Sequence, residues 1–188
     1  VAIRAFAHLE DREEDYAEKV LNGFMKYASV PIVNMESATG HPLQALTDAI
    51  TITEHTTAKR PKVVLTWAPH PKALPQAVSN SFAEMMQLMD VDFCIANPEG
   101  FDLSKEITND TPIYHNQEQA FKDAEFVYAK NWSSFEEYGK TAPLQVDWQI
   151  TDKDMALTNN AKFMHCLPVR RNVVVSDEVI DSENSLVI

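Results

Sequence analysis

The stretch KVVLTWAPHPKALPQAVSNSFAEMMQLMDVDFCIANP, residues 62–98, decides the fold. It opens with an apolar run typical of a buried strand, crosses a proline-bearing loop into a helical segment, and ends in a second apolar run. One face of the helical segment carries the apolar residues Val78, Phe82, Met85 and Met89. A strand, a helix and a second strand in this order predict a βαβ unit with two parallel strands.

The same alternation continues on both sides of this stretch. Upstream, VAIRAFAH at residues 1–8 is expected to form a buried strand and PIVNMES at residues 31–37 a shorter one, joined by a helix. That helix begins in the acidic run EDREED, and its apolar stripe is Tyr16, Val20, Leu21, Phe24 and Tyr27. Further strands are expected at TPIYHN, AEFVYAKNW, KFMHCL and SLVI. Alternating strands and helices predict an α/β fold with a doubly wound parallel sheet and flanking helices.

The tetrapeptide HPLQ, residues 41–44, is expected to begin a helix. Proline suits the first turn of a helix, and apolar residues continue the helix to about residue 56; they are Leu43, Leu46 and Ile50. His41 and Gln44 are three residues apart, so they share one face where free backbone N–H groups favour an anion. A polar break at residues 57–62 follows, and we place a domain boundary there.

A second polar stretch, FMHCLPVRR at residues 163–171, follows a buried strand. Ligands of open α/β sheets bind beyond the carboxyl ends of strands, and arginines are suited to carboxylate or phosphate. Taken singly, His165, Cys166 and the two arginines are more often a satisfied core histidine, a buried thiol and a solvated edge. Together with HPLQ they predict a functional site. Adjacent strand residues point to opposite faces, so His165 and Cys166 form a poor nucleophile and base pair.

Cations and amides predominate at the ends of the expected strands, although the formal net charge of the 188 residues is −12. The polar residues at these ends are Glu36, His70, Asn80, Lys130 and residues 165–170. No glycine-rich phosphate loop, metal-ligand spacing or zinc-type cysteine pattern is present, so neither a nucleotide site nor a metal or other cofactor is expected. These features predict a cationic pocket that positions anionic reactants and stabilises an oxyanion.

Composition excludes several classes of partner. The acidic balance makes nucleic acid and anionic membrane poor partners for the surface as a whole. No apolar run is long enough to span a membrane and no signal peptide is recognisable, so a cytoplasmic location is expected. Because the chain begins and ends in strand-like runs, it is also expected to be a piece of a longer protein.

HPLQ, HCLP and the arginine of VAIRAF together resemble the aspartate and ornithine carbamoyltransferase family. The stretches MESATGHPLQ, FVYAKNWSS and NNAKFMHCLPVRRNVVV resemble its N-acylornithine branch, and its N-succinylornithine members in particular. The resemblance implies transfer of a carbamoyl group from carbamoyl phosphate to the δ-amine of N-succinyl-L-ornithine in arginine biosynthesis, by a cytoplasmic homotrimer without a cofactor. It also implies that residues 1–40 are the tail of a carbamoyl phosphate domain, 41–58 an inter-domain helix and 59–188 an acylornithine-binding domain.

Residue roles follow from the same resemblance. Arg4 and His41 would donate to the carbonyl oxygen of carbamoyl phosphate. Gln44 would hold the amino group of carbamoyl phosphate together with the backbone carbonyls of Cys166 and Leu167. The acylornithine site would contain Glu36, Asn80, Lys130, His165, Pro168 and Arg170. The family's Ser-x-Arg-Thr phosphate loop is absent from these residues, so the chain by itself is expected to be inactive.

Lys130 favours an acylated substrate on physical grounds. A free α-amino group is a cation and requires an acidic partner, whereas acylation removes that charge and succinylation adds a carboxylate that a lysine can bind. Lys130 as a plain surface residue remains an alternative. An N-acetylornithine or ornithine carbamoyltransferase, and a non-catalytic binding domain with the same fold, also remain open.

Overall fold

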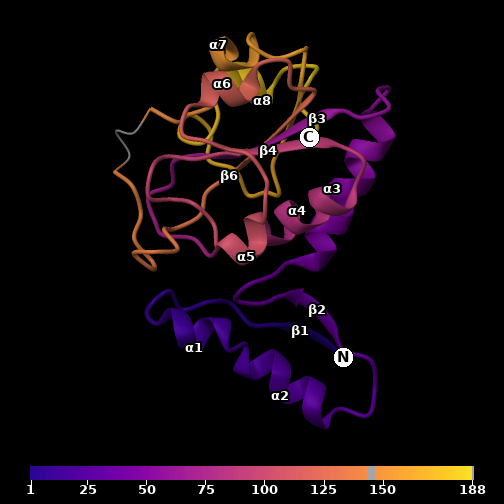
Figure 1. The fold of residues 1–188 in the computed structure, drawn as a ribbon, viewed down its shortest axis with the longest axis vertical. Coiled ribbons are helices and arrows are strands. Elements are labelled where there is room, and N and C mark those ends of the chain that lie inside the picture. The colour runs from indigo at the N-terminus through magenta and orange to yellow at the C-terminus, as the bar shows by residue number, and fades with distance from the viewer. Residues whose placement is uncertain (144–146, 188) are drawn as a thin grey trace.

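The computed structural model describes residues 1–143 and 147–187. It contains a two-stranded sheet near the N-terminus and a five-stranded sheet formed by the rest of the chain, both parallel. Figure 1 shows the small sheet with α1 and α2 at one end of the molecule and the large sheet at the other. The parallel α/β architecture predicted from the sequence is therefore confirmed.

The small sheet pairs β1 (Ala2–Arg4) with β2 (Val33–Glu36) and places Arg4 opposite Glu36. The expectation of a buried first strand is wrong, because only Ile3 of β1 is buried. Within the described residues, no third strand pairs with either edge of this sheet.

Two helices replace the single helix expected between these strands. They are α1 (Arg12–Tyr16) and α2 (Lys19–Tyr27), and Glu18 between them adopts a left-handed conformation with φ 48°. The break lets the Glu18 carboxylate accept from the Thr39 backbone N–H at 2.8 Å and from the Thr39 hydroxyl at 2.7 Å. Side chains of the expected apolar stripe are exposed on α2: Val20, Phe24 and Tyr27.

The helix expected after HPLQ is α3 (Pro42–His55), and it joins the two sheets. Its expected apolar face is wrong: about half of each side chain is exposed at Leu43, Leu46 and Ile50. The buried face instead consists of Ala45, Asp48, Ala49 and Ile52, and it packs against α4 (Ala77–Leu88). Small residues allow the two helices to approach closely, which the apolar pattern of α3 did not reveal.

The large sheet has the strand order β5-β4-β3-β6-β7. Its strands are β3 (Lys62–Trp67), β4 (Asp92–Ala96), β5 (Ile113–Tyr114), β6 (Phe126–Lys130) and β7 (Lys162–Met164). From β3 the chain adds strands outward on one side, then returns to place β6 against the other side of β3. This reversal is the topological switch point of a doubly wound sheet, and a crevice is expected beyond the carboxyl ends of β3 and β6.

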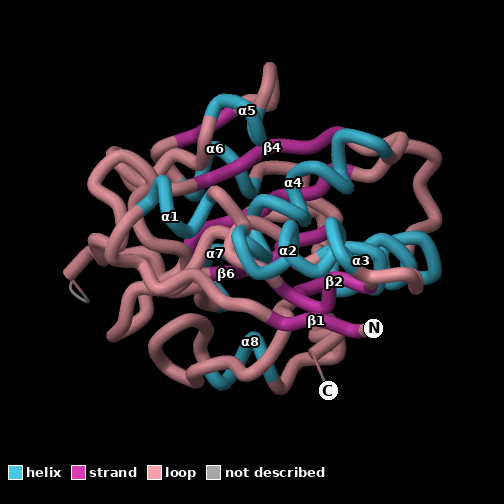
Figure 2. Tube along the Cα trace, turned by 90° about the horizontal axis from the view of Figure 1, so that it is seen from below, coloured by secondary structure: helices cyan, strands magenta, loops and turns pink. Residues whose placement is uncertain are grey.

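Helices cover both faces of the large sheet. Figure 1 shows α4 and α5 (Lys105–Thr108) on one side, and α6 (Gln117–Phe121), α7 (Asp152–Met155) and α8 (Asp177–Ile180) on the other. Between β6 and α7, the described part of the chain consists of loops and turns, drawn in pink in Figure 2. The core between these layers is aromatic-rich, with fully buried Trp67, Phe82, Phe126, Tyr128 and Trp132.

The strand expected at SLVI does not form over its described residues 185–187. Ser185 makes a single parallel bridge to Phe163, and the Leu186 N–H donates to the Phe163 carbonyl at 2.9 Å. A turn closed by the Ser185 N–H and the Ser182 carbonyl runs into this segment. Ser185 is therefore the one described residue of the segment that pairs with β7. No helix in the described part of the chain is long and apolar enough to cross a membrane.

Candidate active site

A cavity of about 560 Å³ lies between the carboxyl ends of the two sheets. Its walls come from the end of β1 and the loop after it, the end of β2, the start of α3, the loop after β3, and the ends of β6 and β7. It contains the predicted site residues Arg4, Glu36, His41, Gln44, Lys130, His165, Cys166, Leu167, Pro168 and Arg170. The two tetrapeptides HPLQ and HCLP, more than a hundred residues apart, thus meet in one cavity.

Parallel pairing of β1 with β2 brings the first charged pair into the cavity. The Arg4 guanidinium donates to one Glu36 carboxylate oxygen through Nη2 at 2.8 Å and Nε at 3.2 Å. It also lies over the Phe6 ring, 4.6 Å from the centroid. This ion pair fixes the direction of Arg4 and leaves its third nitrogen, Nη1, free of the Glu36 pair.

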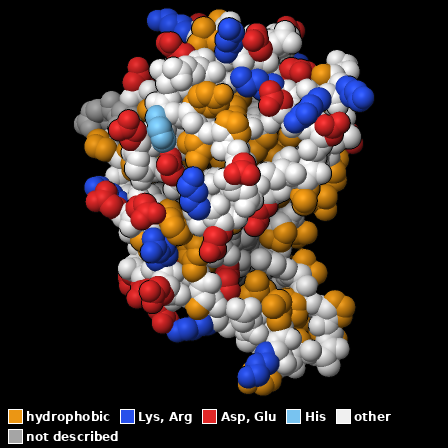
Figure 3. All heavy atoms as spheres, in the orientation of Figure 1, with side chains coloured by type: hydrophobic (Ala, Val, Ile, Leu, Met, Phe, Trp, Pro, Cys, Tyr) orange, Lys and Arg blue, Asp and Glu red, His pale blue; other side chains and the backbone are white. Residues whose placement is uncertain are grey.

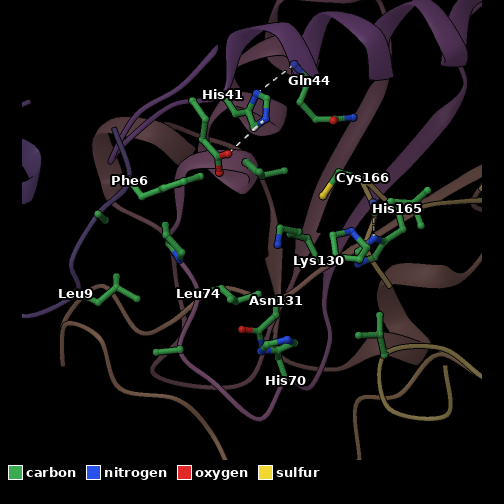
Figure 4. Close-up of a pocket in the computed structure, with 18 of the residues that line it drawn as sticks. Phe6, Leu9, His41, Gln44, His70, Leu74, Lys130, Asn131, His165 and Cys166 are labelled. Carbon is green, nitrogen blue, oxygen red and sulfur yellow. Dashed lines mark hydrogen bonds and ion pairs between the residues drawn. The ribbon is translucent and has the colours of Figure 1, made fainter. Parts of the chain in front are cut away.

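His41 caps α3 and faces the cavity as a neutral hydrogen-bond donor. Its Nδ1 accepts from the Gln44 backbone N–H at 3.4 Å, and its own backbone N–H donates to the Ser81 hydroxyl at 2.8 Å. Burial lowers the pKa of His41, and the nearby Glu36 carboxylate only partly opposes this effect. With Nδ1 accepting, the neutral ring carries its proton on Nε2, which lies 3.7 Å from Glu36 (Figure 4).

The ends of β6 and β7 supply a second group of donors. Figure 4 shows Lys130 and His165 on the opposite side of the cavity from His41. Burial, reinforced by the charge of Lys130 and by His70, lowers the pKa of His165 to about 3. The His165 Nδ1 accepts from the Leu167 backbone N–H at 3.0 Å, so its neutral ring donates through Nε2.

The arginine pair that follows HCLP divides between two roles. Arg170 lines the cavity, and its Nε donates to His70 Nε2 at 3.2 Å. Arg171 instead pairs with Asp177, which is half-buried, at 2.6 Å, and also with the exposed Asp181. The turn between His165 and Arg170 contains a cis Leu167–Pro168 peptide bond and a left-handed Leu167 with φ 50°. Of the two arginines, Arg170 lines the cavity and Arg171 does not.

Cys166 is a thiol rather than a thiolate in this environment. Burial raises the pKa of Cys166, and the charge of Lys130 offsets only part of that rise. A protonated thiol is a weak nucleophile, so the cavity is suited to catalysis by positioned donors rather than by a covalent cysteine intermediate.

The cavity is cationic in a strongly acidic protein. The charged side chains in its described lining are three cations, Arg4, Lys130 and Arg170, and one carboxylate, Glu36. Elsewhere acidic and basic side chains are interspersed, as the face drawn in Figure 3 shows. Residues with the geometry of a metal site, as a group of three or more His, Cys, Asp or Glu side chains, do not occur in the described part of the chain.

Asn80 is the predicted site residue that the structure places elsewhere. Its side chain is fully buried in α4, and its Nδ2 donates to the Thr39 carbonyl at 3.1 Å. Asn80 therefore does not line the cavity; it ties α4 to the loop before His41. In the sequence Asn80 follows a strand and a loop, and that position does not show whether its side chain is buried.

Sequence reasoning missed most of the wall formed by the loop after β1. Phe6, Ala7, His8 and Leu9 line the cavity, as do Leu74 and Asn131 from the loops after β3 and β6. Their position after strand ends was the available signal, but an apolar loop residue carries no chemical mark of a site. The apolar members of this set, Phe6, Ala7, Leu9 and Leu74, give the cavity apolar surface beside its charged groups.

Comparison with known proteins agrees with this arrangement. Residues 75–188 match the family model described as "Aspartate/ornithine carbamoyltransferase, Asp/Orn binding domain". The N-succinylornithine carbamoyltransferase of Bacteroides thetaiotaomicron is 50% identical over the whole chain, which covers 60% of that relative. The N-acetylornithine carbamoyltransferase of Xylella fastidiosa is 35% identical over the whole chain, which covers 62% of it.

Solved structures show the same fold. A crystal structure of N-acetyl-L-ornithine transcarbamylase superimposes with a TM-score of 0.91 and 35% identity over 99% of this chain and 63% of that one. A crystal structure of acetylornithine transcarbamylase complexed with acetylcitrulline also superimposes with a TM-score of 0.91. This chain spans about 60% of the length of the curated relatives it matches. By its fold, its motifs and this similarity, the chain belongs to the aspartate/ornithine carbamoyltransferase family.

Proposed function

We propose that this protein transfers the carbamoyl group of carbamoyl phosphate to the δ-amine of N-succinyl-L-ornithine. The observation that carries the proposal is the convergence of HPLQ and HCLP on one cationic cavity. The 50% identity to an N-succinylornithine carbamoyltransferase supports the choice of amine. The neutral amine attacks the carbamoyl carbon, the bond from that carbon to the phosphate oxygen breaks, and the leaving phosphate takes the amine proton.

The carbonyl oxygen of carbamoyl phosphate gains negative charge during this attack. His41 Nε2–H and the Arg4 guanidinium are the proposed donors to that oxygen. The ion pair of Arg4 with Glu36 and the bond from the Gln44 backbone to His41 hold both donors in place before substrate binds. Donors that are already oriented need no reorganisation as the charge develops, which lowers the barrier.

The amino group of carbamoyl phosphate needs hydrogen-bond acceptors. We assign the Gln44 side-chain oxygen and the backbone carbonyls of Cys166 and Leu167 to this role. The left-handed Leu167 makes the sharp turn that places these residues on the cavity wall. The Cys166 side chain, as a neutral thiol, would lie near the attacking amine without forming a bond to it.

The acylated amino acid brings two carboxylates and no α-ammonium group. Lys130 and Arg170 are the proposed partners of these carboxylates, with His165, Pro168 and Glu36 completing the wall around the side chain. Three cations and a single carboxylate in the lining support an acceptor with two carboxylates and one amine more than free ornithine, which has one carboxylate and two amines.

The organisation of the whole enzyme belongs to the same proposal. Residues 1–40 would be the tail of the carbamoyl phosphate domain, 41–58 the inter-domain helix and 59–188 the acylornithine domain. The enzyme would act as a cytoplasmic homotrimer in arginine biosynthesis. The two separate sheets joined by α3 support the division into domains.

The test is a citrulline-forming assay. We would measure the 188-residue chain and a chimera that joins to it the parts of the Bacteroides thetaiotaomicron relative outside the match. Each would receive carbamoyl phosphate with succinylornithine, acetylornithine or ornithine. We expect turnover by the chimera with a preference for succinylornithine. A preference for acetylornithine would favour the N-acetylornithine assignment, and a folded chimera without turnover would favour a non-catalytic binding domain.

His41→Ala tests the assignment of the oxyanion donor. Loss of one such donor is expected to lower kcat by roughly two to three powers of ten. His55→Ala is the control, because it removes an exposed imidazole at the other end of the same helix. Unchanged kcat in His41→Ala would contradict the role.

A further inference from the structure

Asp48 is a buried carboxylate one helical turn beyond Gln44, outside the lining of the cavity. Asp48 is 4% exposed and lies on the buried face of α3. One oxygen, Oδ1, accepts a hydrogen bond from the Gln44 side-chain Nε2 at 2.9 Å. The other oxygen, Oδ2, is buried and receives no hydrogen bond from the described residues. A buried carboxylate this close to a site residue needs a reason, because its burial costs free energy.

We propose that Asp48 is a positioning residue that locks the Gln44 amide with its oxygen toward the cavity, so that the site selects a phosphorylated donor bearing an amino group. The inference rests on the proposed function and adds the origin of its selectivity for the transferred group.

The argument begins with hydrogen-bonding capacity. An ionised carboxylate can only accept, so the amide group facing Asp48 must be the NH₂ of Gln44. The amide cannot rotate by 180° without placing its oxygen against a carboxylate oxygen in a buried, low-dielectric environment. The carbonyl oxygen of Gln44 is therefore the atom left to the cavity, where Gln44 lies opposite Lys130 and above Cys166 in Figure 4.

At neutral pH the Asp48 carboxylate is ionised, although its burial disfavours the charge. Burial raises the pKa of Asp48 to about 6, while the Gln44 amide and the neighbouring Tyr128 hydroxyl act in the opposite direction. Tyr128 comes from β6 and is itself fully buried, and the Cys166 thiol beyond β7 is the third polar group of the cluster. No cation contacts the carboxylate in the described structure. Above the range of its pKa, the carboxylate accepts the Gln44 hydrogen bond at 2.9 Å, and the described residues form no other hydrogen bond to it.

Selectivity follows from what the locked oxygen requires. Carbamoyl phosphate presents N–H groups that can donate to the Gln44 oxygen. Acetyl phosphate has a methyl group in the same place and would leave that oxygen and the adjoining backbone carbonyls unpaired. A site built to pair a polar group rejects an analogue that lacks it, because its own buried groups lose their partners.

The experiment compares the two donors in the chimera described above. Asp48→Asn keeps the shape of the side chain but can either donate or accept, so both orientations of the Gln44 amide become accessible. Glu54→Gln is the matched control, since it removes one carboxylate charge at an exposed position of the same helix. The dissociation constants of carbamoyl phosphate and acetyl phosphate would be measured for each variant by calorimetry.

We expect Asp48→Asn to raise the dissociation constant of carbamoyl phosphate by about tenfold and that of acetyl phosphate by less than about twofold. Neither constant should change in the control. The double variant Gln44→Glu with Asp48→Asn exchanges donor and acceptor across the pair and should recover part of the discrimination. Equal weakening of both ligands would show a merely structural role and overturn the inference. So would unchanged discrimination.

A second measurement needs only the 188-residue chain. The side-chain NH₂ resonances of Gln44, identified by their loss in Gln44→Glu, should shift as the pH passes through about 6 in the parent. That shift should vanish in Asp48→Asn. Resonances of Gln44 that do not respond to pH or to Asp48→Asn would overturn the inference. If the unmodified chimera fails to bind carbamoyl phosphate at all, the proposed function fails, while the resonance measurement still decides the role of Asp48.

Discussion

Replacing Asp15 by asparagine should loosen one wall of the cavity. The Asp15 carboxylate in α1 accepts from the backbone N–H groups of His8 and Leu9, each at 2.9 Å, and from the Tyr138 hydroxyl at 2.8 Å. It therefore joins α1 to the loop after β1 and to the loop after β6. His8 and Leu9 line the cavity, so this cluster sets the position of the wall they form.

The loss of stability in Asp15→Asn can be estimated from the three donors that Asp15 accepts from. Asp15 is 7% exposed, so an amide at this position would leave one of the two backbone N–H groups facing an NH₂ group without an acceptor. A buried donor left unpaired costs about 1–3 kcal/mol, and the remaining bonds lose the contribution of the charge. We expect a loss of about 2–4 kcal/mol in the free energy of unfolding, or roughly 4–16 °C in Tm for a chain of this length.

The pH dependence of this loss has a defined sign. Burial tends to raise the pKa of Asp15, but the backbone N–H groups of His8 and Leu9 and the Tyr138 hydroxyl outweigh it, so the pKa is lowered in the folded protein. A lowered pKa gives a stabilisation that is complete above the unfolded value of about 3.9 and is lost as the pH falls through the folded value. The difference between parent and Asp15→Asn should therefore shrink below about pH 4.

The assay is urea and thermal unfolding of the 188-residue chain at pH 7 and at lower pH values. Glu13→Gln is the control, since it removes a carboxylate from an exposed position of the same helix. A loss smaller than about 0.5 kcal/mol at pH 7, which is typical of surface substitutions, would refute the reasoning. A difference in the free energy of unfolding between parent and Asp15→Asn that grows as the pH falls would refute it as well.

Two further predictions concern a glycine with positive φ and a lysine of the cavity. Gly139→Ala should destabilise the chain by about 2–4 kcal/mol in urea unfolding, because φ is +76° and a Cβ would collide with the Leu9 carbonyl oxygen. Gly23→Ala, inside α2 with open space around it, should stabilise the chain by about 0.5–1 kcal/mol. Equal effects of the two would contradict this account. Lys130→Met in the chimera should raise the KM of succinylornithine by about tenfold and that of acetylornithine less, because only succinylornithine carries a second carboxylate; a defect confined to the KM of carbamoyl phosphate would show that Lys130 does not contact the acylated amino acid.

Much of the fold could be predicted because its cause is local. Apolar runs such as those around Val64 and Ile95 alternate with amphipathic segments, and this alternation is sufficient for a parallel α/β sheet. His41 and Gln44 were predictable because a proline and a helix start place them on one face. The face of α3 was not predictable, since Asp48 and small alanines rather than Leu46 meet α4.

The chemistry of the site divides in the same way. The amino-acid sequence by itself determined the alternation of most strands with helices, the start of α3 and the residue types that follow the strands, because these depend on short-range periodicity, proline and turn residues. Only the tertiary structure decided that Arg4 pairs with Glu36, that Arg170 and not Arg171 faces the cavity, and that Asn80 is buried beside Thr39. Those outcomes depend on which elements pack together across the switch point of the sheet, and packing between distant segments leaves no mark in the local pattern of either one.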